Sequence, residues 1–225
     1  MPVKIEKITL EAGRRILVVS DIHGHRELLD KLLEKSGYTD DDYLLIVGDI
    51  VEKGPDSLGA LRRVIELSRS ERTVVLIGNV DLWRVKMIEQ LNADKSESFY
   101  IYLLRMREWK GTSLFDEMAD ELGISIDSPA DALSAKEEVC RRFKSEFDFL
   151  RSLPTVVETQ KYIFVHGGLP SPDLDSLGNR NVFNLLKFDN FTSLGVKFEK
   201  YIIVGHWPVT LLNDKIAQAN PVINY

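Results

Sequence analysis

The sequence predicts an α/β fold that closes as a sandwich of β-sheets with helices outside, and three observations support this expectation. Short apolar runs recur along the chain, at residues 16–19, 43–47, 73–77, 162–165 and 201–204. Helically spaced leucines follow the first two runs, and each run ends at a polar cluster that contains glycine. Strands that alternate with helices form largely parallel sheets, whose ligand sites lie outside the carboxyl ends of the strands.

The first predicted unit is a strand, a loop and a helix. The run 16–19 is continuous and apolar, as expected of a strand covered on both faces, and residues 11–13 predict a hairpin before it. The helix that follows is expected to end at Gly37. Its apolar face contains Leu28, Leu29, Leu32 and Leu33.

The same order recurs in the second unit. The run 43–47 leads through a loop at 48–54 into a helix that opens at Pro55, an amino acid favoured in the first turn. This helix contains Leu58, Leu61 and Ile65. A third strand, 73–77, then ends at a Gly-Asn pair.

Residues 82–153 show apolar positions at helical spacing and no strong strand signal, which predicts a helical insertion. The insertion is either a packing and solvating cap or a roof that selects substrate. With 225 residues, 44% of them hydrophobic, the chain suits a single catalytic domain over 1–225.

Composition limits the partners of the protein. The formal net charge of −6 provides no overall positive field for nucleic acid or anionic lipid, so an anionic substrate has to be bound locally. A lone cysteine, Cys140, excludes an internal disulfide and fits a reducing compartment. Neither a secretory signal nor a membrane-spanning run is recognised, which predicts a cytoplasmic chain without a membrane anchor.

Five polar clusters follow the predicted strands, and each combines glycine with a residue type that binds metals. All four histidines lie in or beside these clusters, which scattered structural histidines would not do. Carboxylate, amide and imidazole donors suit borderline ions such as Mn, Fe or Zn. The clusters are Asp21-Ile22-His23-Gly24, Gly48-Asp49, Gly78-Asn79, His166-Gly167-Gly168 and Gly205-His206.

This ordered set, DxHG, GD, GN, HGG and GH, resembles the calcineurin-like metallophosphoesterases over about residues 15–210. Residues 166–174 are similar to the phosphoprotein (Ser/Thr) phosphatase branch, and residues 48–57 to that branch and to bacterial diadenosine-tetraphosphatases. The resemblance implies a four-layer α-β-β-α sandwich of two mixed β-sheets, with a metal site at the carboxyl ends of the strands.

The resemblance also implies two divalent metal ions, with Mn²⁺ expected and Fe or Zn as alternatives. Asp21 and His23 are expected to bind one ion, and Asp49 to bridge both. Ions about 3.5 to 4 Å apart polarise a phosphoryl group and lower the pKa of a shared water. The expected ligands of the second ion are Asn79, His166 and His206.

The sequence departs from the phosphatase pattern in the second and third clusters, which usually read GDxVDRG and GNHE. Lys53 replaces a phosphate-binding arginine and loses its planar fork, and Glu52 replaces an aspartate. Val80 replaces the histidine that protonates the leaving group, so His25 is the suggested substitute acid, with a helix cap or a solvent-facing position as the alternative. Asp81, which follows Val80, completes the expected catalytic set of His25, Glu52, Lys53 and Asp81.

Two further cations and one proline bear on the site. Arg180 and Lys187 are candidate phosphate contacts, with an ordinary surface role as the alternative. Pro208 stands where related proteins have a second histidine, which leaves three protein ligands for the first ion. The chain ends soon after His206, which suggests a shortened or compact version of the fold.

The sequence thus predicts a metallophosphoesterase, with a phosphomonoesterase resembling the Ser/Thr protein phosphatases as the first interpretation. Its substrate would be a phosphoprotein or a small phosphorylated metabolite. A hydrolase of dinucleoside polyphosphates or other nucleotides is the second interpretation. A metal-binding interaction protein without catalysis is the third, motivated by Lys53 and Val80.

Overall fold

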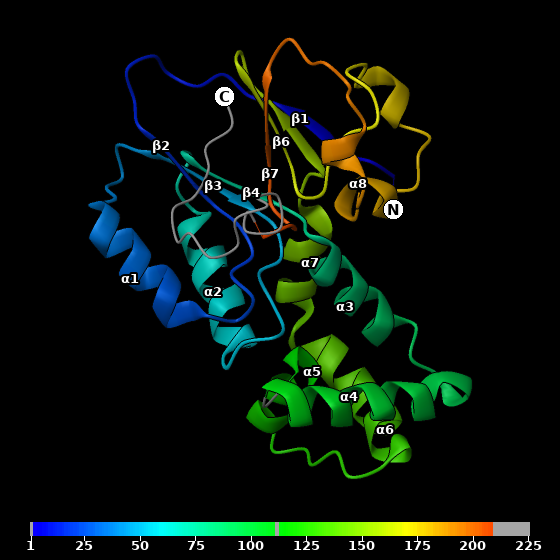
Figure 1. The fold of residues 1–225 in the computed structure, drawn as a ribbon. Helices are drawn as coiled ribbons and strands as arrows, with labels where there is room; N and C mark the ends of the chain where they lie inside the picture. The colour runs from blue at the N-terminus through cyan, green and yellow to red at the C-terminus, as the bar shows by residue number, and fades with distance from the viewer. Residues whose placement is uncertain (1, 111–112, 209–225) are drawn as a thin grey trace, which may run out of the picture.

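The computed structural model describes residues 2–110 and 113–208, and its strands form two sheets (Figure 1). One sheet has the order β2-β3-β4 and only parallel pairings among the described residues. The other has the order β1-β5-β6-β7 and is mixed, because β5 and β6 are antiparallel. The first sheet contains β2 (Ile16–Val19), β3 (Tyr43–Val47) and β4 (Thr73–Leu76). The second contains β1 (Ile5–Lys7), β5 (Val156–Glu158), β6 (Tyr162–Val165) and β7 (Tyr201–Val204).

The hairpin expected at residues 11–13 is wrong. The chain does turn there, at Gly13 with φ of 83°, but the strand before the turn pairs with β5 of the other sheet. This segment therefore crosses between the sheets. A turn signal specifies a reversal of the chain but not the strand that becomes the partner.

The alternation of side chains along β3 explains the layers. Tyr43, Leu45 and Val47 pack with Phe164 of the facing sheet. The two residues between them, Leu44 and Ile46, belong to the core that includes residues of α1 (Arg26–Ser36) and α2 (Ser57–Leu67). The outer face of the mixed sheet packs against the short helices η2 (Asp175–Leu177) and α8 (Phe183–Leu186). The expected four layers, α-β-β-α, are confirmed.

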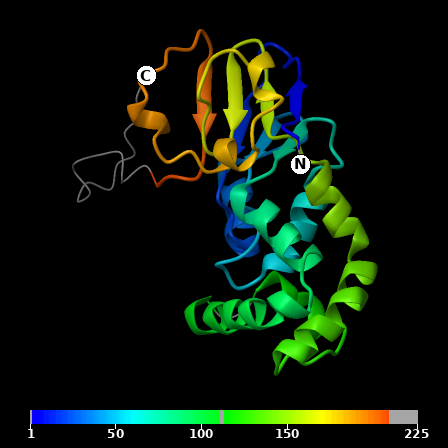
Figure 2. The same cartoon turned by 90° about the vertical axis from the view of Figure 1, so that its right-hand side faces the viewer.

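The helical insertion lies between β4 and β5 and forms a group beside the sandwich (Figure 2). It begins at Asn79, three positions earlier than predicted, because a predicted metal ligand is also the first helical residue. Among the described residues, no helix has the length and apolar composition needed to cross a bilayer. The insertion contains α3 (Asn79–Glu89), η1 (Ala93–Lys95), α4 (Ser96–Lys110), α5 (Leu114–Glu121), α6 (Pro129–Arg142) and α7 (Lys144–Ser152). A further short helix, η3 (Phe191–Ser193), precedes β7.

Candidate dinuclear metal centre

The six predicted metal ligands converge from five strand ends. The donor atoms form two sets, and within each set all donor atoms lie within 4.8 Å of one another. Both sets include Asp49. A single carboxylate shared by two sets is the arrangement that a bridging ligand requires. The first set is Asp21, His23 and Asp49, and the second is Asp49, His166 and His206. Asn79 joins the second set, because its Oδ1 lies 3.0 Å from Nε2 of His166.

Backbone carbonyls orient two of the histidines. Nδ1 of His166 lies 2.7 Å from the oxygen of Val47, and Nδ1 of His23 lies 3.2 Å from the oxygen of Val51. Because a carbonyl only accepts hydrogen bonds, each Nδ1 is the donor, and each Nε2 faces the centre. Outer hydrogen bonds of this kind fix the orientation of metal-binding imidazoles.

The donor atoms fit a cation. Nε2 of His166 lies 3.3 Å from Oδ2 of Asp49, and Nε2 of His23 lies 3.5 Å from the same oxygen and 3.7 Å from Oδ1 of Asp21. When Nε2 of each histidine is unprotonated, its lone pair and those of the carboxylate oxygens face one another, and positive charge between them removes the repulsion. The mixture of imidazole, carboxylate and amide donors suits borderline divalent ions.

The backbone of the site is held in an unusual conformation. The six non-glycine residues with positive φ among the described residues all lie in the site loops. L-residues rarely adopt this region, and such strain concentrates at functional sites. Four of them are predicted ligands and the other two are adjacent in the second loop: Asp21, His23, Asp49, His206, Glu52 and Lys53.

Glycine permits the loops to approach one another. A Cβ atom on Gly78 would lie 2.1 Å from the nitrogen and 2.2 Å from Oδ1 of Asp49. Gly48 has φ of 80°, and a Cβ there would lie 2.6 Å from Cα of Gly78. The Gly-Asp and Gly-Asn pairs of the sequence therefore reflect close packing of two neighbouring strand ends.

The protonation states of His23, His206 and Asp49 favour metal binding. Burial lowers the pKa of His23, although the charge of Asp49 acts in the opposite direction. Burial and the neighbouring His166 lower the pKa of His206. Both imidazoles are therefore neutral at pH 7 and have a free lone pair. Burial would raise the pKa of Asp49, but the contact with His166 lowers it, so the shared position is negatively charged. Burial opposes a charge on His166, yet Asp49 raises its pKa.

Asp81 stabilises the loop that contains Asp49. Its side chain is fully buried, and Oδ1 accepts hydrogen bonds from the backbone N–H groups of Ile50, at 2.8 Å, and Val51, at 3.1 Å. Oδ2 accepts from the N–H of Gly78 at 3.0 Å, at the start of α3. Burial and the nearby Asp49 raise the pKa of Asp81 to about 7. Asp81 is thus a positioning residue for two ligand loops.

Glu52 connects the same loop to the helical insertion. Its carboxylate is 1% exposed and accepts a hydrogen bond of 2.7 Å from the hydroxyl of Tyr102 in α4. It also lies 3.2 Å from Nε of Arg84 in α3 and accepts from the N–H of Leu114 in α5 at 3.2 Å. Burial raises the pKa of Glu52, and Arg84 and Tyr102 act in the opposite direction. Three helices of the insertion thereby contact one side chain of a ligand loop.

Lys53, the next residue, points toward the metal centre. Its ammonium nitrogen lies 3.0 Å from Nε2 of His23. This contact places the Lys53 side chain beside the first donor set.

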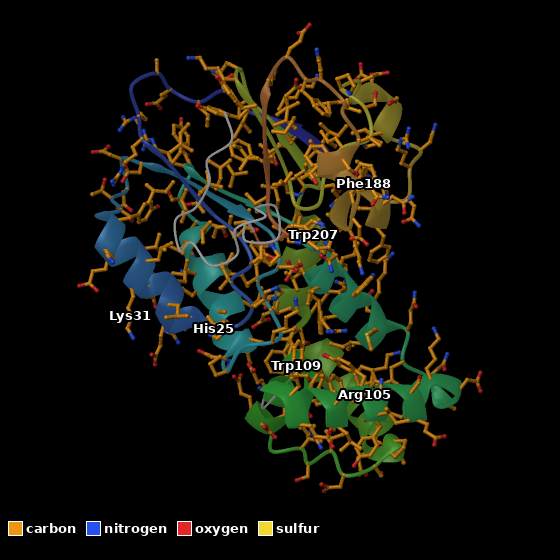
Figure 3. All side chains as sticks on the ribbon, in the orientation of Figure 1. His25, Lys31, Arg105, Trp109, Phe188 and Trp207 are labelled. Carbon is orange, nitrogen blue, oxygen red and sulfur yellow. The ribbon has the colours of Figure 1, made fainter. Side chains whose placement is uncertain are left out.

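The other expected residues lie farther out. His25 is exposed at the N-cap of α1 and makes no side-chain capping bond (Figure 3). Arg180 is exposed in the segment between η2 and α8, whereas Lys187 lies over the ring of Trp83 in α3, with Nζ 5.7 Å from the ring centroid.

Sequence reasoning missed three residues around His206. Oδ1 of Asp189 lies 3.5 Å from Nε2 of His206, and no pattern around this lone aspartate could have indicated it. The ring of Trp207 lies 5.6 Å from the ring of His206, edge to face, and Figure 3 places Trp207 near the strand ends. Ser20 donates to Oδ2 of Asp21 at 2.6 Å, and its position beside a predicted ligand was the available signal.

A profile of the calcineurin-like phosphoesterases matches residues 14–222. The chain therefore belongs to the calcineurin-like phosphoesterase family, a class of hydrolases that act on phosphoester bonds and use divalent metals.

Relatives within the family carry more specific names. The symmetrical bis(5'-nucleosyl)-tetraphosphatase of Escherichia coli O17:K52:H18 (strain UMN026 / ExPEC) is 27% identical over 185 residues, which cover 76% of this chain and 65% of the relative. The protein of the same name from Buchnera aphidicola subsp. Acyrthosiphon pisum (strain Tuc7) is 37% identical over 83 residues, or 36% of this chain and 30% of the relative. The matched part of the chain thus spans less than two thirds of the length of these curated relatives.

One solved structure with a similar chain is a protein serine/threonine phosphatase from Saccharomyces cerevisiae. It is 18% identical, has a TM-score of 0.47, and is matched over 86% of this chain and 51% of its own length.

Proposed function

We propose that this chain is a metal-dependent hydrolase of phosphoanhydrides in nucleotides, with dinucleoside polyphosphates as the preferred substrates. The observation that supports this proposal most directly is Val80 beside the shared ligand. Its N–H donates to Oδ1 of Asp49 at 2.8 Å, while its isopropyl side chain has no proton to transfer.

The leaving group explains why Val80 favours an anhydride. A nucleoside phosphate leaves as a weakly basic anion and needs little protonation, whereas the alkoxide of serine or threonine is strongly basic and depends on an acid. A site with valine at this position therefore suits a good leaving group. The names of the E. coli and Buchnera relatives agree with this choice.

Two divalent ions, proposed to be Mn²⁺, would be held by Asp21, His23 and Asp49 and by Asp49, Asn79, His166 and His206. When bound, they would supply Lewis acidity that polarises a phosphoryl group and acidifies water. The protein's own contribution is to hold Asp49 ionised between His23 and His166 and to present the Lys53 ammonium to the phosphate.

A phosphomonoesterase is the second candidate, because residues 166–174 are similar to the phosphoprotein phosphatases. For poor leaving groups His25 remains the proposed proton donor, two positions beyond His23. A protein that binds metal without hydrolysis is the remaining alternative. We further propose that the protein acts in the cytoplasm, where the lone Cys140 would stay reduced.

Metal analysis combined with a substrate panel tests the proposal. We expect two metal ions per chain after loading with manganese, and hydrolysis of diadenosine tetraphosphate in preference to phosphoserine peptides. Asp49→Asn should reduce the rate by more than about 100-fold, the upper loss typical of removing only an outer-shell partner of a metal ligand. Asp94→Asn, an exposed carboxylate in η1, is the matched control. Bound metal without turnover of any phosphoester would reject a hydrolase.

A further inference from the structure

Two aromatic rings and two lysines interleave where α8 packs on α3. Nζ of Lys187, at the end of α8, lies 5.7 Å from the ring centroid of Trp83 in α3. Reciprocally, Nζ of Lys86 in α3 lies 4.4 Å from the ring centroid of Phe183 in α8. The two rings are 5.9 Å apart. This group is called the α3–α8 aromatic cluster below.

The cluster adjoins the second donor set. Trp83 follows Asn79 by four positions, so both lie on one face of α3, with about 6 Å between them along the helix axis. On the other side, the backbone N–H groups of Gly167 and Gly168 donate to the oxygen of Leu185 in α8, at 3.1 and 3.0 Å. Both helices of the cluster are thus fixed directly to residues at the metal centre.

The surface of the cluster is open and positively charged. Trp83 is 39% exposed although Phe183 and Lys187 pack against it. Within residues 2–110 and 113–208, neither Lys86 nor Lys187 forms an ion pair with a carboxylate. In a chain with a net charge of −6, an aromatic face with two such ammonium groups is a local binding surface for an anion that has a flat ring.

We propose that this cluster is a nucleoside subsite, in which the indole of Trp83 stacks on a base and Lys187 binds a phosphate of the same nucleotide. This inference rests on the proposed nucleotide hydrolase, and it adds the part of the substrate that the metal centre does not contact. Stacking on an aromatic ring tolerates any base, because every base has a π-face. The subsite therefore accepts purine and pyrimidine nucleotides and excludes base-free polyphosphates.

Calorimetric titration of the manganese-loaded protein with ADP and with pyrophosphate tests the subsite, and each probe has a methylene bridge in place of the anhydride oxygen so that neither can be hydrolysed. Trp83→Ala should weaken ADP binding about tenfold, equal to about 1.4 kcal/mol, and leave pyrophosphate binding unchanged. Trp83→Phe, which keeps a ring, should retain most of the affinity. Trp109→Ala is the matched control, because Trp109 is 64% exposed and lies on α4, well apart from Trp207 at the strand ends (Figure 3).

The outcomes separate the two proposals. Equal ADP affinity in wild type and Trp83→Ala, or an equal loss for ADP and pyrophosphate, would overturn the subsite. So would wild-type protein that binds ADP no more tightly than pyrophosphate. Hydrolysis rates report on the other proposal: a protein that binds ADP through Trp83 but cleaves no nucleotide would retain the subsite and reject the hydrolase.

Discussion

The Lys53 ammonium lies 3.0 Å from Nε2 of His23, while the carboxylate of the preceding residue, Glu52, is buried among helices of the insertion. Both residues have φ of 68°, in the left-handed region, and their adjacent side chains contact different parts of the molecule. The contacts of Glu52 with Tyr102 and Arg84 hold this strained pair in place. Packing of the insertion thereby positions the cation that faces the metal centre.

Removing the charge of Lys53 should weaken substrate binding. Lys53→Met is expected to raise KM for diadenosine tetraphosphate about tenfold or more, because a hydrogen bond to a charged group contributes about 1.5–3 kcal/mol. Lys53→Arg should bind at least as well as wild type, since a planar guanidinium contacts two phosphate oxygens. Steady-state kinetics checks both variants, with the exposed Lys31→Met as control. An unchanged KM in Lys53→Met would exclude a phosphate contact.

Removing the Tyr102 hydroxyl should destabilise the fold. Burial and the adjacent Glu52 raise the pKa of Tyr102, so the hydroxyl stays protonated and donates to Glu52. Tyr102→Phe leaves a buried carboxylate oxygen without this donor. The substitution should lower the free energy of unfolding, measured by urea denaturation, by about 1–3 kcal/mol. Tyr100→Phe, on the same helix, removes a hydrogen bond to Asp127 at an exposed position and should cost less. Equal losses would contradict a special role for Glu52.

Acid should lower the free energy of unfolding through Asp42, which precedes β3 at the end of the strand opposite the metal centre. Two hydrogen bonds from Arg15, at 3.0 and 2.7 Å, and one from the N–H of Thr39 hold the pKa of Asp42 well below its usual range. Because the folded pKa is depressed, the stability from this group is present above about pH 4 and is lost as pH falls further. Urea denaturation between pH 7 and pH 2 should show that the free energy of unfolding falls less in Asp42→Asn than in wild type. Asp41→Asn, whose carboxylate is 83% exposed, is the control and should behave as wild type does.

A role for His25 as proton donor should depend on the leaving group. His25→Ala is expected to lower kcat about 100-fold for an alkyl phosphate such as phosphoserine, and to leave nitrophenyl phosphate unaffected, because a nitrophenolate needs no proton. Parallel assays with both substrates measure the difference. If His25→Ala changes neither rate while Asp49→Asn abolishes both, His25 is only the N-cap of α1.

The sequence by itself determined the layers and the ligand types. Parallel strands expose their carboxyl ends at one edge, so Asp21, Asp49 and His166, which follow three strands, were expected to meet. Each apolar run is followed by a polar cluster that contains glycine, and this local pattern can be read directly from a single sequence. The same local information predicted helices over the insertion, although Asn79 begins them earlier than the pattern suggested.

Only the tertiary structure decided the contacts between distant segments. Glu52 was expected beside the chemistry, but its carboxylate contacts Tyr102 across 50 positions, because the insertion offered buried donors. The contact between Trp83 and Lys187 likewise joins residues 104 positions apart, and no spacing in the chain predicts it. Long-range pairing depends on which surfaces meet when the sheets and helices pack, and that choice is a property of the whole core.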